Sequence, residues 1–240
     1  MGRKASSSPG DGRDQAVSQT AEAYEAIRTA IITWDLAPGE HVTEGNLAAR
    51  TGFGRAPVRA ALARLSHEQL VTAIPRRGYQ VAPITFKYVT DVFGVRMVLE
   101  PAAARMVAAR GDDAIVARLE ALNERCRYVP DPYDAPALRL ANKAFHVEIA
   151  RVTGNDRLTG ITSAALDDLQ RILYLPQVAQ ETDRVAATFE EHQRIVEAIR
   201  RRDPHQAEAA AIAHIELNKT MLIDLLIGTS EIGSINLFRS

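Results

Sequence analysis

The chain has 240 residues, which suits one large domain or two domains of ordinary size. A hydrophobic content of 46%, with 29 basic and 30 acidic residues, is typical of a folded globular protein. The single cysteine, Cys126, excludes an internal disulfide framework and a metal site built from cysteines. We find neither a long apolar run nor a signal-peptide core, so we expect a cytoplasmic protein without a membrane segment. By itself, the net charge of -1 argues against a nucleic-acid partner.

The N-terminal part of the sequence predicts helices separated by glycine and proline. Residues 1–14 are rich in serine, glycine and charge, and we expect a disordered tail there. Apolar residues recur at three- and four-residue steps from Ala16 to Trp34, and this spacing predicts an amphipathic helix. A second helix is predicted from about Glu44 to Thr51 with Thr43 as its cap, and a third begins near Arg55.

A change of periodicity follows the third helix and indicates a hairpin. The β-prone runs 70–74 and 79–83 flank Pro75-Arg76-Arg77-Gly78, which predicts two strands joined by a basic tip that contains glycine. Three helices followed by a hairpin predict a winged helix-turn-helix domain over residues 15–84.

The rest of the chain lacks strand patterns and predicts an antiparallel all-α bundle over residues 85–227, so the fold class is mainly α. The first helical segment is long enough for two helices with a bend near Gly94, which gives six or seven helices. Residues 228–240 carry no clear pattern, and we expect a C-terminal tail. The predicted helical segments are 85–109, 112–127, 136–152, 156–175, 183–201 and 204–226.

Positive charge is concentrated in one short part of the predicted winged domain. Between Asn46 and Gly78, six arginines stand against one glutamate, a net charge of +5 over 33 residues, which leaves -6 for the other 207. The arginines gather at the start of the third helix and at the hairpin tip, where a winged helix meets DNA. This pattern predicts DNA binding, although arginines also occur on ordinary solvated faces. They are Arg50, Arg55, Arg59, Arg64, Arg76 and Arg77.

The same residues resemble those of a known family. The run Thr43-Glu44-x-x-Leu47-Ala48-Ala49-Arg50-x-Gly52-Phe53-Gly54-Arg55-Ala56-Pro57-Val58-Arg59, followed by Pro75-Arg76-Arg77-Gly78-Tyr79, is similar to the winged helix-turn-helix of GntR-family bacterial transcription regulators. The family commonly has Ser, Thr and Glu where this chain has Gly54, Ala56 and Ala60, so two hydroxyls that would bond phosphates are missing here. The resemblance implies a DNA-binding set of Arg50, Arg55, Ala56, Pro57, Arg59, Arg76, Arg77 and Gly78.

Three of the six histidines lie among apolar helix residues in the second half of the chain. Asn142 and His146 are four residues apart, so both project from one face of the same predicted helix. His192 and His214 lie near the middle of two later helices, so all four groups can converge inside the bundle. Imidazoles with an amide oxygen suit Zn²⁺, Ni²⁺, Mn²⁺ or Fe²⁺. The alternative is that each inward histidine is a hydrogen-bonded core residue without a metal.

The second half also resembles the FCD ligand-binding domain of FadR-type GntR regulators. The matching residues are Val95-Arg96-x-x-Leu99-Glu100, Asn142-x-x-Phe145-His146, Glu191-His192-x-x-Ile195 and His214. Metal-binding members commonly have Asp in place of Asn142. Without the negative charge of that carboxylate, the site holds a cation more weakly but attracts an anionic ligand more strongly. The resemblance implies a divalent metal on Asn142, His146, His192 and His214, with Arg96 and, more weakly, Arg171 facing a carboxylate effector. The alternative for Arg96 is a surface ion pair with Glu100 at i,i+4.

The resemblance implies a dimeric, ligand-responsive transcription regulator, most often a repressor in this family, that binds a palindromic operator. A small organic acid would bind at the metal and near Arg96, with different affinities for the free and operator-bound states. One alternative is a DNA-binding dimer whose helical domain binds neither metal nor effector. Another is a histidine-metal enzyme, but the His-Glu-x-x-His motif that would supply its general base is missing, so we expect no enzyme.

Overall fold

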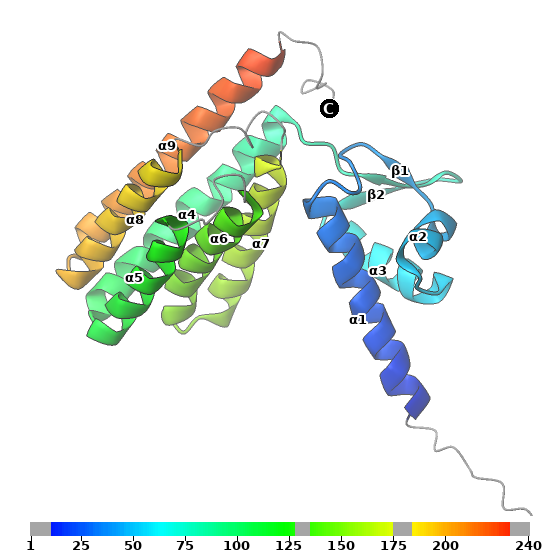
Figure 1. Ribbon diagram of the computed structural model, residues 1–240, viewed down its shortest axis with the longest axis horizontal. Helices are drawn as coiled ribbons and strands as arrows, with labels where there is room; N and C mark the ends of the chain where they lie inside the picture. The colour runs from blue at the N-terminus through cyan, green and yellow to red at the C-terminus, as the bar shows by residue number, and fades with distance from the viewer. Residues whose placement is uncertain (1–10, 128–134, 175–183, 231–240) are drawn as a thin grey trace, which may run out of the picture. The chain divides into compact units, whose positions relative to one another are not determined.

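The computed structural model describes residues 11–127, 135–174 and 184–230 (Figure 1). The chain divides into two compact units, with the boundary between Ile84 and Thr85. Each unit has its own cluster of buried apolar side chains, so each is stabilised by its own packing. Within the described ranges, every helix is too short or too polar to cross a membrane.

The N-terminal unit packs three helices against a small antiparallel sheet. Helix α1 lies along α3, and Ile27, Leu62 and Val81 are fully buried between the helices and the sheet. The strand order is β1-β3-β2, so β3 is central, and Ile74 pairs with Gly78 where the β2–β3 hairpin turns. The elements are α1 (Asp11–Ile32), β1 (His41–Val42), α2 (Glu44–Thr51), α3 (Arg55–His67), β2 (Val71–Ile74) and β3 (Gly78–Val81).

The predicted winged helix-turn-helix is confirmed, with two differences. Helix α1 begins at Asp11, so the last four residues of the predicted tail are helical, while residues 1–10 lie outside the described part of the chain. Strand β1 is not predicted by the sequence, because two residues are too few to show an alternating pattern. His41 and Val42 become a strand by pairing with Gln80 and Tyr79 of β3.

Local sequence signals set the joint between α2 and α3. The Thr43 hydroxyl oxygen accepts a hydrogen bond from the Asn46 amide at 3.2 Å, so Thr43 caps α2 as predicted. Gly52 ends α2 at φ 78°, a left-handed conformation that glycine adopts without a Cβ penalty. Helix α3 begins three residues later, with Pro57 in its first turn, where the missing amide hydrogen is not needed.

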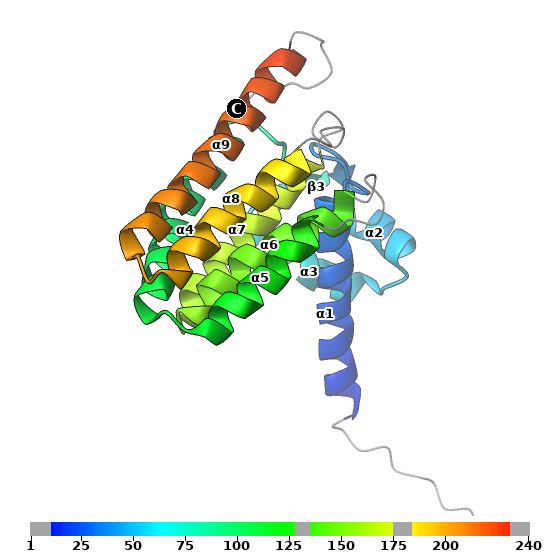
Figure 2. The ribbon, with the colours of Figure 1, turned by 60° about the vertical axis from the view of Figure 1, so that its left-hand side comes forward.

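The C-terminal unit is a bundle of long helices that lie side by side in two views 60° apart (Figures 1 and 2). Helix α4 contacts α6, α7, α8 and α9, so it forms the centre of the packing. Val107, Phe145 and Ile195 are among the fully buried residues of the bundle core. The helices are α4 (Phe86–Arg110), α5 (Asp113–Arg127), α6 (Ala135–Val152), α7 (Asp156–Leu173), α8 (Arg184–Arg200) and α9 (Pro204–Ser230).

All six predicted helical segments of the bundle correspond to observed helices, and two details are corrected. Helix α4 continues through Gly94 as a single helix, because packing on four neighbouring helices outweighs the weak helix propensity of one glycine. Helix α9 extends to Ser230, so the first three residues of the predicted C-terminal tail are helical. Residues 231–240 lie outside the described range.

Candidate DNA interface and metal centre

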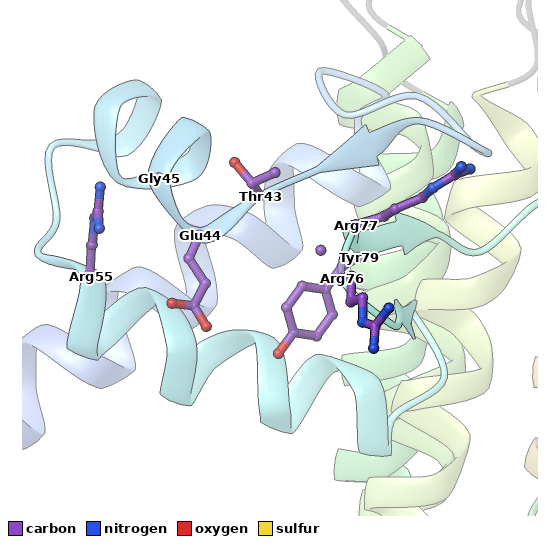
Figure 3. Close-up of a pocket in the computed structure, with 8 residues that line it drawn as sticks. Thr43, Glu44, Gly45, Arg55, Arg76, Arg77 and Tyr79 are labelled. Carbon is purple, nitrogen blue, oxygen red and sulfur yellow. The ribbon is translucent and has the colours of Figure 1, made fainter.

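An open hollow of about 440 Å³ lies where the start of α2, the start of α3 and the hairpin tip meet (Figure 3). Figure 3 shows Arg55 on one side and Arg76 and Arg77 on the other, with Glu44 and Tyr79 between them. All three arginines are exposed, so their charges face solvent from a concave surface. The lining residues are Thr43, Glu44, Gly45, Arg55, Arg76, Arg77, Gly78 and Tyr79.

A predicted DNA contact, Arg59, is held by an acidic neighbour from another helix. Its Nε and Nη2 atoms donate to the two carboxylate oxygens of Glu44 at 2.9 and 2.8 Å. The Arg59 side chain remains 68% exposed, so the pair sits at the surface and links α3 to α2. These hydrogen bonds lower the pKa of Glu44, which therefore carries its negative charge on the basic face.

The other predicted DNA contacts, Arg50, Ala56 and Pro57, are not among the residues that line the hollow. Arg50 donates to the backbone carbonyl of Asp35 at 2.6 Å and to Glu40 at 3.0 Å. Ala56 is exposed and Pro57 is half-buried, both in the first turn of α3. Arg50 thus helps to hold the loop before β1, whereas Ala56 and Pro57 lie on the predicted recognition helix beside Arg55.

The glycine at the hairpin tip is required by the backbone. Gly78 has φ 93°, and a Cβ at this position would lie 2.4 Å from the carbonyl oxygen of Val42. No side chain fits at that distance, so only glycine lets β3 approach the end of β1 here. Arg76 also has a positive φ of 63°, so the tip that presents the two arginines is a tight, strained turn.

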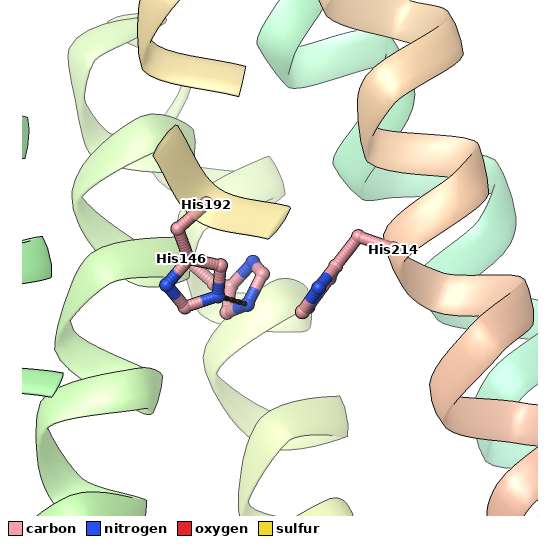
Figure 4. A group of neighbouring side chains, drawn as sticks. All are labelled: His146, His192 and His214. Atoms are coloured by element: carbon pink, nitrogen blue, oxygen red, sulfur yellow. Dashed lines mark hydrogen bonds between the residues drawn. The ribbon is translucent and has the colours of Figure 1, made fainter. Parts of the chain in front are cut away.

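Three of the predicted metal ligands are brought together inside the bundle (Figure 4). His146 from α6, His192 from α8 and His214 from α9 are at most 3% exposed, and one nitrogen of each lies within 4.8 Å of the others. The Nε2 atoms of His146 and His192 are 3.2 Å apart. The His192 ring also stacks on Phe145, with ring centres 4.1 Å apart, so an apolar surface holds its plane.

Each of the three imidazoles has an oxygen partner at its Nδ1 atom. His146 contacts Glu100 at 2.9 Å, and His214 contacts Glu191 at 2.7 Å. His192 contacts the side-chain oxygen of Asn123 at 3.1 Å. An oxygen acceptor at Nδ1 favours the tautomer that carries its hydrogen there and leaves the Nε2 lone pair available. Glu100 and Glu191 fall within the runs that resemble the FCD domain, but no sequence pattern assigns any of the three partners a role in the site.

The spacing of two of the three imidazoles fits a divalent cation, and a nitrogen of the third lies within 4.8 Å of theirs. Two imidazole nitrogens at about 2.0–2.1 Å from one ion, at angles between octahedral and tetrahedral, are about 2.9–3.4 Å apart, and the observed separation is 3.2 Å. Two Nε2 lone pairs at this distance repel each other unless a proton or a cation lies between them. Burial lowers the pKa of His192 well below its usual value and that of His214 to about 4, so both rings are neutral at pH 7.

Asn142, the fourth predicted ligand, is not part of this compact group. It lies half-buried on α6, one turn before His146. The hydrogen bonds described for the three rings go to Glu100, Asn123 and Glu191, with Asn218 adding an amide contact to His214. The role of Asn142 as a ligand therefore remains a prediction.

Arg96 pairs with Glu100, but inside the bundle and not on the surface. Its Nε and Nη2 atoms donate to the two carboxylate oxygens at 2.6 and 3.2 Å, and Arg96 is 1% exposed. Burial acts to raise the pKa of Glu100, but the Arg96 charge and the contact with His146 outweigh it and hold that pKa well below its ordinary value. Arg171, the weaker effector candidate, is fully buried on α7 and faces the ring of Tyr88 near the start of α4.

Comparisons with known proteins match both units of the chain. The family model "Bacterial regulatory proteins, gntR family" matches residues 19–81, and the FCD domain model matches residues 91–217. The HTH-type transcriptional repressor GlaR of Escherichia coli (strain K12) is 26% identical over 202 residues, which is 81% of this chain and 91% of GlaR. The HTH-type transcriptional regulator YdhC of Bacillus subtilis (strain 168) is 24% identical over 194 residues, 80% of this chain and 85% of YdhC.

Solved structures agree with this match at the level of the fold. The structure of E. coli McbR/YncC superposes with a TM-score of 0.75 at 18% sequence identity, and it covers 87% of this chain and 98% of that one. The FCD model alone matches more than half of the 240 residues. The chain therefore belongs to the GntR family of bacterial regulatory proteins with an FCD domain, whose members are transcription regulators and not enzymes.

Proposed function

We propose that the protein is a FadR-type repressor that binds a palindromic operator as a homodimer and responds to a small carboxylate sensed at a metal centre. The observation that carries the DNA-binding part is the gathering of Arg55, Arg76 and Arg77 around one hollow. The similarity to GlaR, which is named a repressor, supports the direction of regulation. A regulator that binds chromosomal DNA works in the cytoplasm, so this is the proposed location.

In this proposal α3 is the recognition helix. Its N-terminal turn enters the major groove, so that Arg55 reaches guanine edges or phosphates and Arg59 reaches the backbone. The hairpin tip with Arg76, Arg77 and Gly78 lies over the adjacent phosphates or minor groove. Both contacts place positive charge on phosphate, so operator affinity falls steeply as salt concentration rises.

The homodimer would form through the helical units. On α4, Val95, Val98 and Met106 are 43%, 70% and 45% exposed, and they recur at spacings that place them on one face. Leu217 of α9 is 49% exposed, and an Arg105–Glu208 ion pair joins the same two helices. Covering this apolar face with a second copy removes it from water and gives the two-fold symmetry that a palindromic operator requires.

His146, His192 and His214 would hold a divalent ion such as Zn²⁺, Ni²⁺, Mn²⁺ or Fe²⁺. When bound, the ion supplies positive charge and open coordination positions for a carboxylate oxygen. Arg96 supplies the second anchor in this proposal, because its buried Nη1 atom has no hydrogen-bond acceptor among the described residues. Effector binding at these groups shifts operator affinity only if the free and DNA-bound states bind the effector unequally.

The test of this proposal uses full-length protein without a histidine tag. Selection from random DNA duplexes is expected to enrich a palindrome with half-sites about one helical turn apart. A thermal-shift screen of carboxylic acids with Zn²⁺ or Ni²⁺ present then identifies candidates, and each hit is added to the operator-binding assay. Failure to enrich any sequence would overturn the DNA-binding proposal. If an operator sequence is enriched but no acid changes the affinity for it, the result would instead favour a DNA-binding dimer whose helical unit binds no effector.

A further inference from the structure

We propose that Glu100, Asn123 and Glu191 are positioning residues of the histidine centre. Each one fixes a single imidazole through its Nδ1 atom, so that the Nε2 atoms turn toward one divalent cation. This inference rests on the proposed metal binding and adds to it the residues that determine how tightly the cation is held.

The first argument is the pairing between histidines and oxygen acceptors. Three histidines have three different acceptors, and every pair joins two helices. Glu100 of α4 reaches His146 of α6, and Asn123 of α5 reaches His192 of α8. Glu191 lies next to His192 in sequence but bonds His214 of α9 instead. An ordinary core histidine also needs an acceptor, but here all three acceptors are at Nδ1, which leaves the Nε2 atom of each ring for a cation.

The second argument is burial. Glu100, Asn123 and Glu191 are 5%, 0% and 7% exposed. Moving a carboxylate from water into a bundle core costs several kcal/mol unless charge or hydrogen bonds compensate for it. Arg96 compensates much of this cost for Glu100, and the Asn218 amide contacts Glu191. A cation bound at Nε2 strengthens the hydrogen bond to each acceptor further, because the Nδ1–H donor becomes more acidic.

The third argument is that two of the acceptors are themselves held in place. The Asn123 amide nitrogen donates to the Phe189 carbonyl oxygen at 3.1 Å and lies 3.4 Å from a Gln193 side-chain oxygen. These bonds leave the Asn123 oxygen facing His192. The Glu100 carboxylate is fixed by Arg96 at 2.6 Å, which holds it ionised and oriented toward His146.

The outer carboxylates also supply negative charge that the inner ligands lack. Asn142 brings no charge, and three neutral imidazoles leave the full +2 charge of the ion in a buried site. Glu100 and Glu191 each lie one imidazole away from the proposed ion. They are thus the described acidic groups placed to balance this charge.

The test is cation affinity measured by competition with a chromogenic chelator, together with the visible spectrum of the Co²⁺-loaded protein. Glu100→Ala and Glu191→Ala are each expected to weaken binding about 10–100-fold, and to change the Co²⁺ band because a ring is released. Glu100→Gln and Glu191→Gln keep an oxygen acceptor, so their losses are expected to be smaller. The matched control is Glu148→Gln, since Glu148 lies on the helix of His146 but pairs with Arg151 and Arg118.

Loss of folding is separated from loss of positioning by the melting temperature of each metal-free variant. Should Glu100→Ala unfold because Arg96 is left buried without its partner, the double variant Arg96→Met/Glu100→Ala removes that charge as well. Wild-type affinity and an unchanged Co²⁺ spectrum in the folded alanine variants would overturn the inference and leave metal binding intact. Absence of binding by the wild-type protein would instead refute the metal centre itself, and the positioning roles with it.

Discussion

The Glu44 carboxylate accepts two hydrogen bonds from the Arg59 guanidinium, at 2.9 and 2.8 Å, and so joins the first turn of α2 to α3. A negative charge therefore stands beside the arginines that line the hollow of the winged domain. In the proposed binding mode, a DNA phosphate has to compete with Glu44 for Arg59, and the carboxylate would repel phosphates that approach in the wrong register. We propose that Glu44 weakens binding to unrelated DNA and orients Arg59 for the operator.

Replacing Glu44 with Gln is expected to raise affinity for unrelated duplexes several-fold while lowering the preference for the operator. The physical reason is that the substitution removes a charge that phosphate must overcome and also frees Arg59 from its fixed orientation. Dissociation constants for operator and scrambled duplexes at one salt concentration measure both effects. Glu197→Gln is the matched control, because Glu197 pairs with two arginines, Arg200 and Arg201, in the helical unit. An operator preference that rises in the Glu44 variant would contradict the proposed orienting role.

Arg55→Ala is expected to abolish the sequence-specific shift of an operator fragment and leave the fold intact. Arg55 is exposed at the start of α3, so its removal leaves no cavity. Loss of one bidentate base contact costs about 1–3 kcal/mol of discrimination. Electrophoretic mobility shift with operator and scrambled competitor is the measurement, and circular dichroism checks the fold. Arg64→Gln serves as control, since Arg64 lies over the Tyr24 ring and pairs with Glu68. Specific binding retained by the Arg55 variant would refute its role.

Removing divalent cations is expected to lower the melting temperature of the helical unit. At a free cation concentration about 100 times the dissociation constant, binding stabilises the folded state by about 2.7 kcal/mol. That corresponds to roughly 5–10 °C for a unit of this size. Differential scanning fluorimetry before and after chelation, and after adding Zn²⁺ or Ni²⁺, measures the change. Metal analysis giving less than about 0.1 equivalent, with no shift on re-addition, would rule out the metal centre.

Gly78→Ala is expected to destabilise the winged unit more than Gly52→Ala does. Both glycines have positive φ, which costs an alanine roughly 1–2 kcal/mol. At Gly78 the new Cβ would also lie 2.4 Å from the Val42 carbonyl oxygen, whereas at Gly52 it meets nothing within 4 Å. Urea denaturation gives the loss of unfolding free energy for each variant. The amount by which the loss at Gly78 exceeds the loss at Gly52 measures the clash between the hairpin and β1. Equal costs at the two positions would show that β1 moves aside freely.

Much of the fold follows from local signals in the sequence. The apolar spacing along each helix, the Thr43 cap and breaks at residues such as Gly52 and Gly111 all act within one or two turns of the chain. Their positions therefore predict the helices to within a few residues. Strand β1 escapes prediction because its pairing partners, Gln80 and Tyr79, lie about 40 residues further along the chain.

In the candidate sites too, the sequence predicts residues from local patterns but not the contacts between residues far apart in the chain. The sequence identifies His146, His192 and His214 because each lies on an inward helix face. Their oxygen partners come from other helices, with the Asn123–His192 pair separated by 69 residues, and one sequence contains no signal for such a pairing. The basic cluster counted from Asn46 likewise omits Glu44, which lines the same hollow and pairs with Arg59.

The pairs around the three histidines also connect α4, α5, α6, α8 and α9 at a single level of the bundle. In the proposed metal centre, a bound ion would link these five helices at that level, so its removal is expected to lower the free energy of local opening there. Amide hydrogen exchange and proteolytic cleavage of the helical unit are then expected to depend on cation supply. On this proposal, the lifetime of the regulator in the cell, and not only its affinity for an effector, would depend on metal availability.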